Sequence, residues 1–228
     1  MTVNVRLLQL ADSALPIGGY THSWGLETAI ASRIVADPAS LETWTRQWLN
    51  ASLSSLEGVL VACSCRAAAI DDAAMISELA ELANVSIIPP SVKQASYEMG
   101  DQLIALGQTW NWSTERLARL IETVRMPPRG WHHAIAFGVL GAIAGSGAVD
   151  VLTAYLHQAT LGMISAGVRA IPLGHTHGQQ VLAYLQDDIC RLASELSNAP
   201  ANRVGAGCPF YEVLCNEQTQ LYARMFRS

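Results

Sequence analysis

The chain has 228 residues, of which half are hydrophobic and only 14% are charged. Such a chain can bury a large core and still leave apolar surface for partner proteins. The net charge is −5 and the single lysine, Lys93, belongs to no basic run, which argues against a nucleic-acid-binding protein.

The termini and the cysteines bear on the compartment. Residues 1–10 lack the basic and apolar regions of a signal peptide. The longest uncharged apolar stretch, 134–149, is shorter than the ~20 residues of a membrane span and predicts a buried helix. The five cysteines are odd in number and form no C-x-x-C pair, which is typical of reduced thiols. We therefore expect a cytoplasmic protein that does not cross a membrane.

Helical periodicity dominates the first third of the chain. A short helix is expected before the turn at Gly18-Gly19, and no stretch alternates with the period of two that a strand requires. Asp37-Pro38 predicts an N-cap followed by a proline in the first helical turn. The helix that follows carries an apolar stripe formed by Leu41, Trp44, Trp48, Leu49, Leu53 and Leu56.

Further breaks divide the middle of the chain. Asp71-Asp72 predicts a helix start, Asn84 a helix end, and Pro89-Pro90 the start of a helix that reaches about Gly107. Ser113 is expected to cap the next helix, before the break at 126–130. That helix carries an apolar stripe formed by Leu117, Leu120, Ile121 and Val124.

The last third predicts two long helices and a tail. Gly141 and Gly145 in the apolar stretch predict close helix packing, within the chain or across a dimer. Helices are expected from about Asp150 to Pro172 and from about Thr176 to Asn198, followed by a loop over 199–209. We predict an all-α, single-domain helical bundle of about nine or ten helices over residues 1–228, with 208–228 as a candidate flexible tail.

The chain lacks the sequence motifs by which common enzyme classes are recognised. There is no phosphate-binding G-x-x-x-x-G-K-[ST] loop, no H-E-x-x-H and no G-x-S-x-G. His175 and His177 would face the same side of an extended segment, but two imidazoles rarely make a metal site alone. Neighbouring His132 and His133 diverge on a helix and favour packing or an interface. Cys63 and Cys65 are expected to fill the core, and we predict no catalytic residue, no metal site and no cofactor.

A second interpretation stays open at this point. An all-α enzyme or small-molecule-binding protein would need a pocket between helices with convergent polar groups. His132, His175 and Glu27 are the side chains that could supply them.

The segment from Leu7 to Glu27, LLQLADSALPIGGYTHSWGLE, resembles the N-terminal motif of the UreF family of urease accessory proteins. Further resemblances follow in order: SYEMG with QL at 96–103, HAIAFG at 133–138 and RAIPLG at 169–174 with Thr176 and Gly178-Gln179. The ending YARMFRS resembles the family's Arg-x-Phe-Arg-Ser terminus. The pattern departs at His175, where glutamine is usual, and at Asp101, where a basic residue is common.

This resemblance implies an all-helical, dimeric and non-catalytic protein. Members bridge the accessory protein UreD (also called UreH) and the GTPase UreG, and the complex docks on apo-urease for GTP-dependent nickel insertion. The UreF protein is expected to gate the GTPase, with nickel passing only in transit.

The resemblance also suggests residues for partner binding. Tyr20, His22, Trp24 and Glu27 lie at the glycine turn, where aromatic side chains either anchor an interface or pack inward. Arg169, Gln179 and Gln180 flank the RAIPLG motif and are expected to contact the GTPase, with core packing as the alternative. The tail is expected to order on binding UreD, through Tyr222, Arg224, Phe226 and Arg227.

Overall fold

The computed structural model describes residues 3–205 and 208–228, and these residues form helices joined by short loops without a strand. In chain order the α-helices are α1 (Val5–Leu10), α2 (Leu26–Ala31), α3 (Pro38–Trp48), α4 (Val59–Ala69), α5 (Ala73–Ser86), α6 (Pro90–Gly107), α7 (Thr114–Thr123), α8 (His133–Ile143), α9 (Ala148–Ala170), α10 (His175–Leu196) and α11 (Pro209–Glu217). Short 3₁₀ turns are η1 (Gly19–Thr21), η3 (Ala201–Arg203) and η4 (Gln218–Gln220), and η2 (Leu49–Gly58) is a π-helix. The all-α prediction is confirmed.

The elements α3, η2 and α4 run without interruption from Pro38 to Ala69. Counted as one rod, they reduce the eleven α-helices of the described residues to ten. The predicted apolar stripe on this rod is confirmed, because five of its six members are buried and Leu56 is partly buried against the core.

Helix starts follow the local sequence with one exception. The Asp37 side chain accepts a hydrogen bond of 2.8 Å from the Ser40 backbone N–H, while the Ser40 hydroxyl bonds back to the Asp37 backbone N–H. Asp72 caps α5 by accepting from the Met75 N–H. Ser113 precedes α7 as expected, but its hydroxyl donates to the Gly107 carbonyl, so the prediction that its side chain caps α7 is wrong.

Helix α8 is the centre of the bundle, and every one of its residues is buried. A Cβ atom built on Gly138 would lie 2.1 Å from the Ser64 Oγ and 2.6 Å from the Val61 carbonyl oxygen of α4. At Gly141 the same atom would lie 2.5 Å from Val151 of α9. The predicted close packing therefore occurs within the chain at Gly141, whereas Gly145 follows the helix end with a positive φ of 86°, and an added Cβ there would meet nothing within 4 Å.

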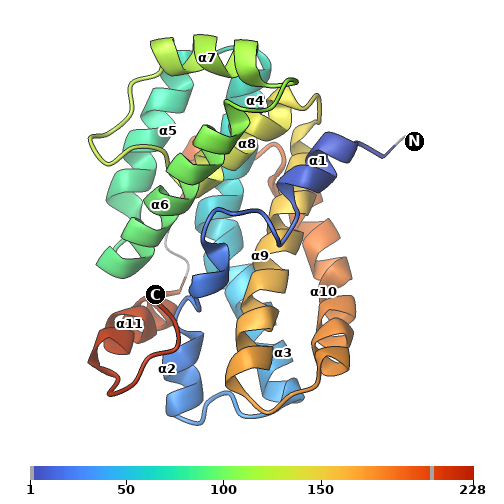
Figure 1. The fold of residues 1–228 in the computed structure, drawn as a ribbon, viewed down its shortest axis with the longest axis vertical. Helices are drawn as coiled ribbons and strands as arrows, with labels where there is room; N and C mark the ends of the chain where they lie inside the picture. Colours follow the sequence, from blue (N-terminus) through green and yellow to red (C-terminus); the bar gives the residue numbers. More distant parts are fainter. Residues whose placement is uncertain (1–2, 206–207) are drawn as a thin grey trace.

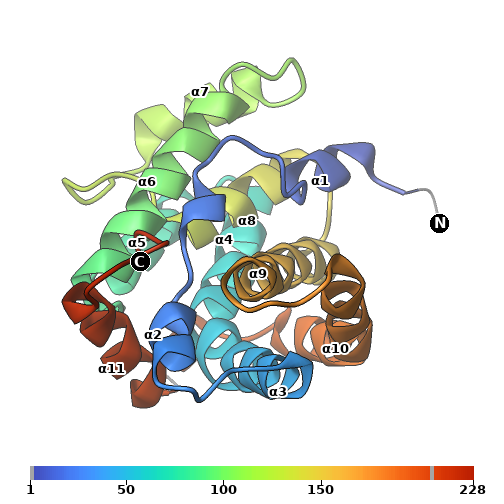
Figure 2. The same cartoon turned by 60° about the horizontal axis from the view of Figure 1, so that its bottom comes forward.

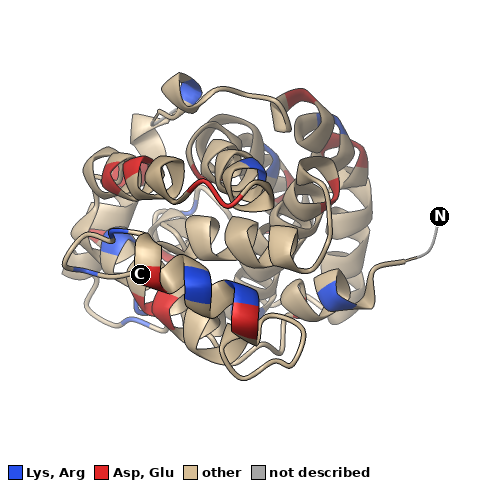
Figure 3. Ribbon diagram, turned by 90° about the horizontal axis from the view of Figure 1, so that it is seen from above, with Lys and Arg blue, Asp and Glu red and all other residues tan. Residues whose placement is uncertain are grey.

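The other helices surround α8 in two groups (Figure 1). Helices α4, α5 and α6 pack around one side, and α9 lies between α8 and α10 on the other, as Figure 2 also shows. Helix α11 packs against α2 and α6, so the C-terminal segment lies beside α2, whereas the two termini lie apart (Figure 1). Figure 3 shows the charged residues mainly on the outer helices. In the described parts of the chain, every helix is too short or too polar to cross a membrane.

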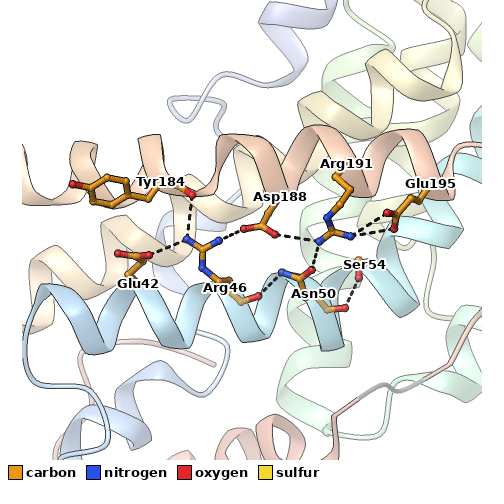
Figure 4. Close-up of polar contacts among 8 residues, drawn as sticks. All are labelled: Glu42, Arg46, Asn50, Ser54, Tyr184, Asp188, Arg191 and Glu195. Carbon is orange, nitrogen blue, oxygen red and sulfur yellow. Dashed lines mark hydrogen bonds and ion pairs between the residues drawn. The ribbon is translucent and has the colours of Figure 1, made fainter.

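The rod from Pro38 to Ala69 is joined to α10 by a polar network (Figure 4). Arg46 pairs with Asp188 and also bonds Glu42 of its own helix, at 2.8 Å. Arg191 donates to the Asn50 side-chain oxygen at 2.6 Å and to Asp188 at 3.1 Å. Arg46 and Asn50 therefore tie the end of α3 and the start of the π-helix η2 to α10.

Candidate functional site

A tight turn positions the aromatic residues near the N-terminus. Gly18 and Gly25 have positive φ angles of 85°, and Trp24 itself has a φ of 53°, which is uncommon for a bulky residue. A side chain at Gly25 would crowd Cys215 of α11 in addition to straining the backbone. The turn between η1 and α2 is therefore shaped by contacts with the C-terminal segment.

Ser228 lies inside this turn. Its carbonyl oxygen accepts hydrogen bonds from the backbone N–H groups of Ser23, at 2.5 Å, and of Trp24, at 3.2 Å. Its hydroxyl lies 2.7 Å from the His22 Nδ1. The Arg227 N–H donates to the Thr21 carbonyl at 2.8 Å, so the last two residues bind the turn through backbone and side-chain contacts.

Glu27 holds the preceding part of the tail. Its carboxylate accepts hydrogen bonds from the backbone N–H groups of Met225, at 2.5 Å, and of Phe226, at 3.3 Å. It also accepts from the Gln218 side-chain amide at 2.9 Å. The phenyl ring of Phe226 is buried. Glu27 therefore positions the tail and does not face a pocket between helices, which corrects its assignment as a candidate pocket residue.

Arg169 of α9 links the two segments. Its guanidinium carbon lies 3.6 Å from the centre of the Tyr20 ring and 4.8 Å from that of Phe226. Its Nη2 donates to the Tyr20 carbonyl at 2.8 Å. We call the assembly of residues 20–27, residues 218–228 and Arg169 the terminal junction.

The predicted partner-binding residues divide into exposed and buried sets. Tyr20, Tyr222, Arg224 and Arg227 are exposed, whereas His22 and Phe226 are buried within the junction and Trp24 is partly buried. Gln179 and Gln180 are also exposed but lie on α10, apart from the residues that form the junction. The structure thus brings together residues of the turn and of the tail, which the sequence analysis treated as separate sites, and their role in partner binding stays a prediction.

The tail is docked in this structure. Pro209–Glu217 forms α11, the Thr28 hydroxyl donates to the Leu214 carbonyl at 2.9 Å, and the Tyr211 hydroxyl donates to the Trp44 carbonyl at 2.9 Å. Residues 206 and 207, in the expected loop before the tail, lie outside the described residues. Release of 208–228 from this position, and its ordering by a partner, stay predictions.

The histidines singled out in the sequence lie at the starts of α8 and α10. Helix α10 begins at His175, so His175 and His177 lie two helical positions apart and their side chains diverge, contrary to the extended geometry considered from the sequence. His132 caps α8, and its Nε2 lies 2.7 Å from the Ser96 hydroxyl, which confirms a packing role. Within residues 3–205 and 208–228, no three His, Cys, Asp or Glu side chains converge as metal ligands.

Three residues that the sequence singled out have structural roles. Asp101 accepts a hydrogen bond of 2.8 Å from the Trp131 N–H and holds the loop that enters α8. Cys63 and Cys65 are buried in α4, and burial raises the pKa of Cys65 to about 11, so both behave as core residues.

A cavity of about 250 Å³ lies beneath the terminal junction, between η2, α6, α8 and α9. Its polar lining includes Glu57, His133 and Tyr155, while Trp24 and Trp48 form apolar walls. The expected pocket residues were different, since His132 is bonded to Ser96 and His175 is exposed. One signal was available in the sequence, because Glu57 is the only charged residue between Arg46 and Arg66.

Burial shifts the pKa values of several of these groups. Desolvation raises the pKa of Glu57 to about 7 and lowers that of His133 to about 4. The pKa of His22 falls to about 4, mainly through burial and also through the positive charge of Arg227. At neutral pH both imidazoles are therefore uncharged and can accept hydrogen bonds.

Comparison with known proteins identifies relatives over almost the whole chain. The family model described as UreF matches residues 35–186. Urease accessory protein UreF of Arthrobacter sp. (strain FB24) is 31% identical over 98% of this chain and 96% of its own length. The protein of the same name from Granulibacter bethesdensis is 31% identical over 98% of this chain and 93% of its own, and that from Nostoc sp. is 30% identical over 98% and 95%.

Proposed function

Since the chain belongs to the UreF family of urease accessory proteins, we propose that it is a non-catalytic adaptor in the cytoplasm that bridges UreD (UreH) and the GTPase UreG. In this role it supports GTP-dependent nickel insertion into apo-urease and gates the GTPase. Nickel is the cargo of the assembled complex and passes this chain only in transit.

The terminal junction is the observation that carries the proposal. It presents the exposed aromatic rings of Tyr20 and Tyr222 together with the exposed Met225, around the buried anchor Phe226. Phe210 and Val213 of the adjoining α11 are each about half exposed. Aromatic residues and methionine with nearby arginines are the side chains that protein interfaces favour, so this surface suits UreD.

A different surface suits the GTPase. Gln179 and Gln180 project from the first turns of α10 and are exposed, so they can form hydrogen bonds across an interface without first breaking contacts in this chain. Arg169 is committed to Tyr20 and Phe226, which makes it a link between the junction and α9. We therefore assign GTPase contact to the two glutamines and a positioning role to Arg169.

A homodimer is part of the proposal. The glycines of α8 contact neighbouring helices of the same chain. The dimer contact is therefore expected elsewhere, on exposed apolar residues such as Val85 of α5 and Ile88 of the loop that follows it. Light scattering of the purified chain, with Val85→Ser as the disruptive variant, measures this directly. A monomer at all concentrations contradicts it.

Urease activation in cells tests the function. Cells that carry the other accessory genes are compared with this gene present, deleted or truncated before Cys208, and the nickel content of purified urease is measured with its activity. We expect nickel-poor, inactive urease after deletion and after truncation, provided that the truncated chain stays folded. Normal nickel content without the gene contradicts the adaptor role.

The alternative of an all-α enzyme or small-molecule-binding protein is favoured by one observation, the cavity lined by Glu57, His133 and Tyr155. This cavity is compatible with the adaptor role, because a bound ligand need not undergo a reaction.

A further inference from the structure

Three polar side chains from different elements face the cavity under the junction. They are the Glu57 carboxylate of η2, the His133 imidazole of α8 and the Tyr155 hydroxyl of α9. The rings of His133 and Tyr155 lie 5.4 Å apart between their centres. Their convergence on one internal space is the arrangement of a small-molecule site.

None of these groups is satisfied by the described protein atoms. The His133 Nε2 is buried and has no hydrogen-bond partner. The Glu57 carboxylate makes no hydrogen bond or ion pair with a described residue, and the Tyr155 hydroxyl makes no hydrogen bond with one. The Ser96 hydroxyl, on the same cavity wall, is bonded to His132. Buried polar groups are nearly always paired, so the unpaired His133 Nε2, in a cavity that the partly buried Glu57 also lines, points to a ligand.

The acidic residues that line the cavity are the partly buried Glu57 and the exposed Asp12. Burial alone raises the pKa of Glu57, and no basic side chain lies close enough to oppose this effect. Arg169 on the rim is held by the Tyr20 ring and by the carbonyl groups of Tyr20 and Ser165. A cationic ligand would supply the missing positive charge and stabilise the ionised carboxylate.

The walls of the cavity suit an organic cation better than a metal ion. Trp24, Trp48 and Tyr155 provide aromatic surface, which attracts cations and packs against apolar groups. A transition metal usually requires three or four nitrogen, sulfur or carboxylate ligands, and the described residues contain no such cluster. The volume of about 250 Å³ accommodates on the order of eight to ten non-hydrogen atoms, given about 30 Å³ for a water molecule in the liquid.

The π-helical segment that carries Glu57 is a separate indication that the cavity is a functional site. Leu53 and Glu57 reach the cavity from the ten-residue π-helix η2, and π-helical segments occur frequently at functional sites. We propose that this cavity binds a small organic cation with an apolar body, whose ammonium or guanidinium group pairs with Glu57 and donates to His133 and Tyr155.

Three probes of nearly equal size test the charge preference on the purified full chain. They are 2-phenylethylammonium, the neutral 2-phenylethanol and the anionic phenylacetate, and their affinities are measured by calorimetry and by the fluorescence of the cavity tryptophans. We expect the ammonium probe to bind at least tenfold more tightly than the alcohol, with phenylacetate weakest. Equal affinities, or no binding of any probe, overturn the proposal.

Variants assign the binding to this cavity. Glu57→Gln should abolish the preference for the ammonium probe, whereas Glu122→Gln, which changes an exposed acid on α7, should leave it unchanged. Ala159→Leu narrows the cavity from α9 while keeping a helix-forming residue, and should weaken binding of both the ammonium probe and the alcohol. An ammonium preference that survives Glu57→Gln in a folded chain contradicts the assignment.

Nickel chloride alone is the last probe, and it tests whether the cavity binds a metal ion instead. Nickel binding that competes with the ammonium probe and is lost in Glu57→Gln and in His133→Gln would show a metal site and overturn the organic-cation proposal. All arms use the isolated chain, so their outcome is independent of urease activation.

Discussion

The contact between α4 and α8 and the terminal junction both join distant parts of the chain, but they do so with different chemistry. The α4–α8 contact is fully buried and depends on backbones brought together at Gly138. The junction is held by hydrogen bonds to Glu27 and Ser228, and its outer residues are exposed. Close apolar packing specifies a fold, whereas a partly exposed polar contact can be exchanged for contacts with a partner.

Acidification is expected to have the largest effect, and it acts mainly on the core. Burial lowers the pKa values of His132 and His133 to about 3 and 4, and that of His22 in the junction to about 4. Below about pH 6.5 the unfolded chain binds protons on these histidines that the folded chain does not. Their contribution to the free energy of unfolding is therefore complete above about pH 6.5 and is lost as the pH decreases. Glu57 has the opposite effect on the pH dependence of stability, because its raised pKa lets the folded chain bind a proton below about pH 7.

Between pH 6.5 and 4.5 the unfolded chain binds on the order of two protons more than the folded chain. The free energy of unfolding therefore falls by about 2.7 kcal/mol for each pH unit of acidification. Urea unfolding at pH 6.5, 5.5 and 4.5 measures this slope. His22→Gln should reduce this slope by about half, because it removes one of the protons that the unfolded chain gains. A free energy of unfolding that is flat over this range contradicts the burial of neutral histidines.

Gly138→Ala tests the core contact. The added Cβ would meet the Val61 backbone and Ser64, so we expect a loss of about 3 kcal/mol, at the upper end for overpacking. The matched control is Gly162→Ala in α9, where an added Cβ meets nothing within 4 Å. That control should be neutral or should stabilise the helix by up to about 1 kcal/mol. Thermal unfolding of both variants gives the difference, and equal melting temperatures would contradict the close approach of α4 and α8.

Glu27→Gln tests the junction. The amide weakens the charge-assisted hydrogen bonds to Met225 and Phe226, and we expect the junction alone to lose about 1–2 kcal/mol of local stability. Amide exchange at Met225 and Phe226 should accelerate about tenfold, while exchange in α8 stays unchanged. Glu217→Gln, which changes an exposed acid at the end of α11, is the control. Equal acceleration in α8 would mean that the junction and the core unfold as one unit.

The ion pair between Arg227 and Glu98, at 3.2 Å, is expected to have the smallest effect. The Arg227 side chain is about two-thirds exposed, so Arg227→Gln should cost less than about 1 kcal/mol. Denaturant titration of this variant and of Glu98→Gln should give similar small losses, further reduced at high salt. A loss of several kcal/mol would place Arg227 among the residues that fix the fold.

The sequence predicted the fold well because its helix boundaries are local features. Pro38, Asp72 and Pro90 act within their own helical turns, and the buried stripe on α7 follows a simple period. The site was predicted less completely, because it depends on distant contacts. The pairing of Ser23 with Ser228 spans almost the whole chain, and the π-helical register that turns Glu57 into the cavity is set by packing against other helices.

Binding of UreD to chain variants tests the role of the terminal junction most directly. Tyr222→Ala removes a fully exposed ring from the junction, and Tyr184→Ala removes an exposed ring from α10 as the matched control. We predict that the dissociation constant rises at least tenfold for Tyr222→Ala, about 1.4 kcal/mol, and stays unchanged for Tyr184→Ala. Unchanged affinity for Tyr222→Ala, or a loss confined to Tyr184→Ala, would contradict the terminal junction as the surface that binds UreD.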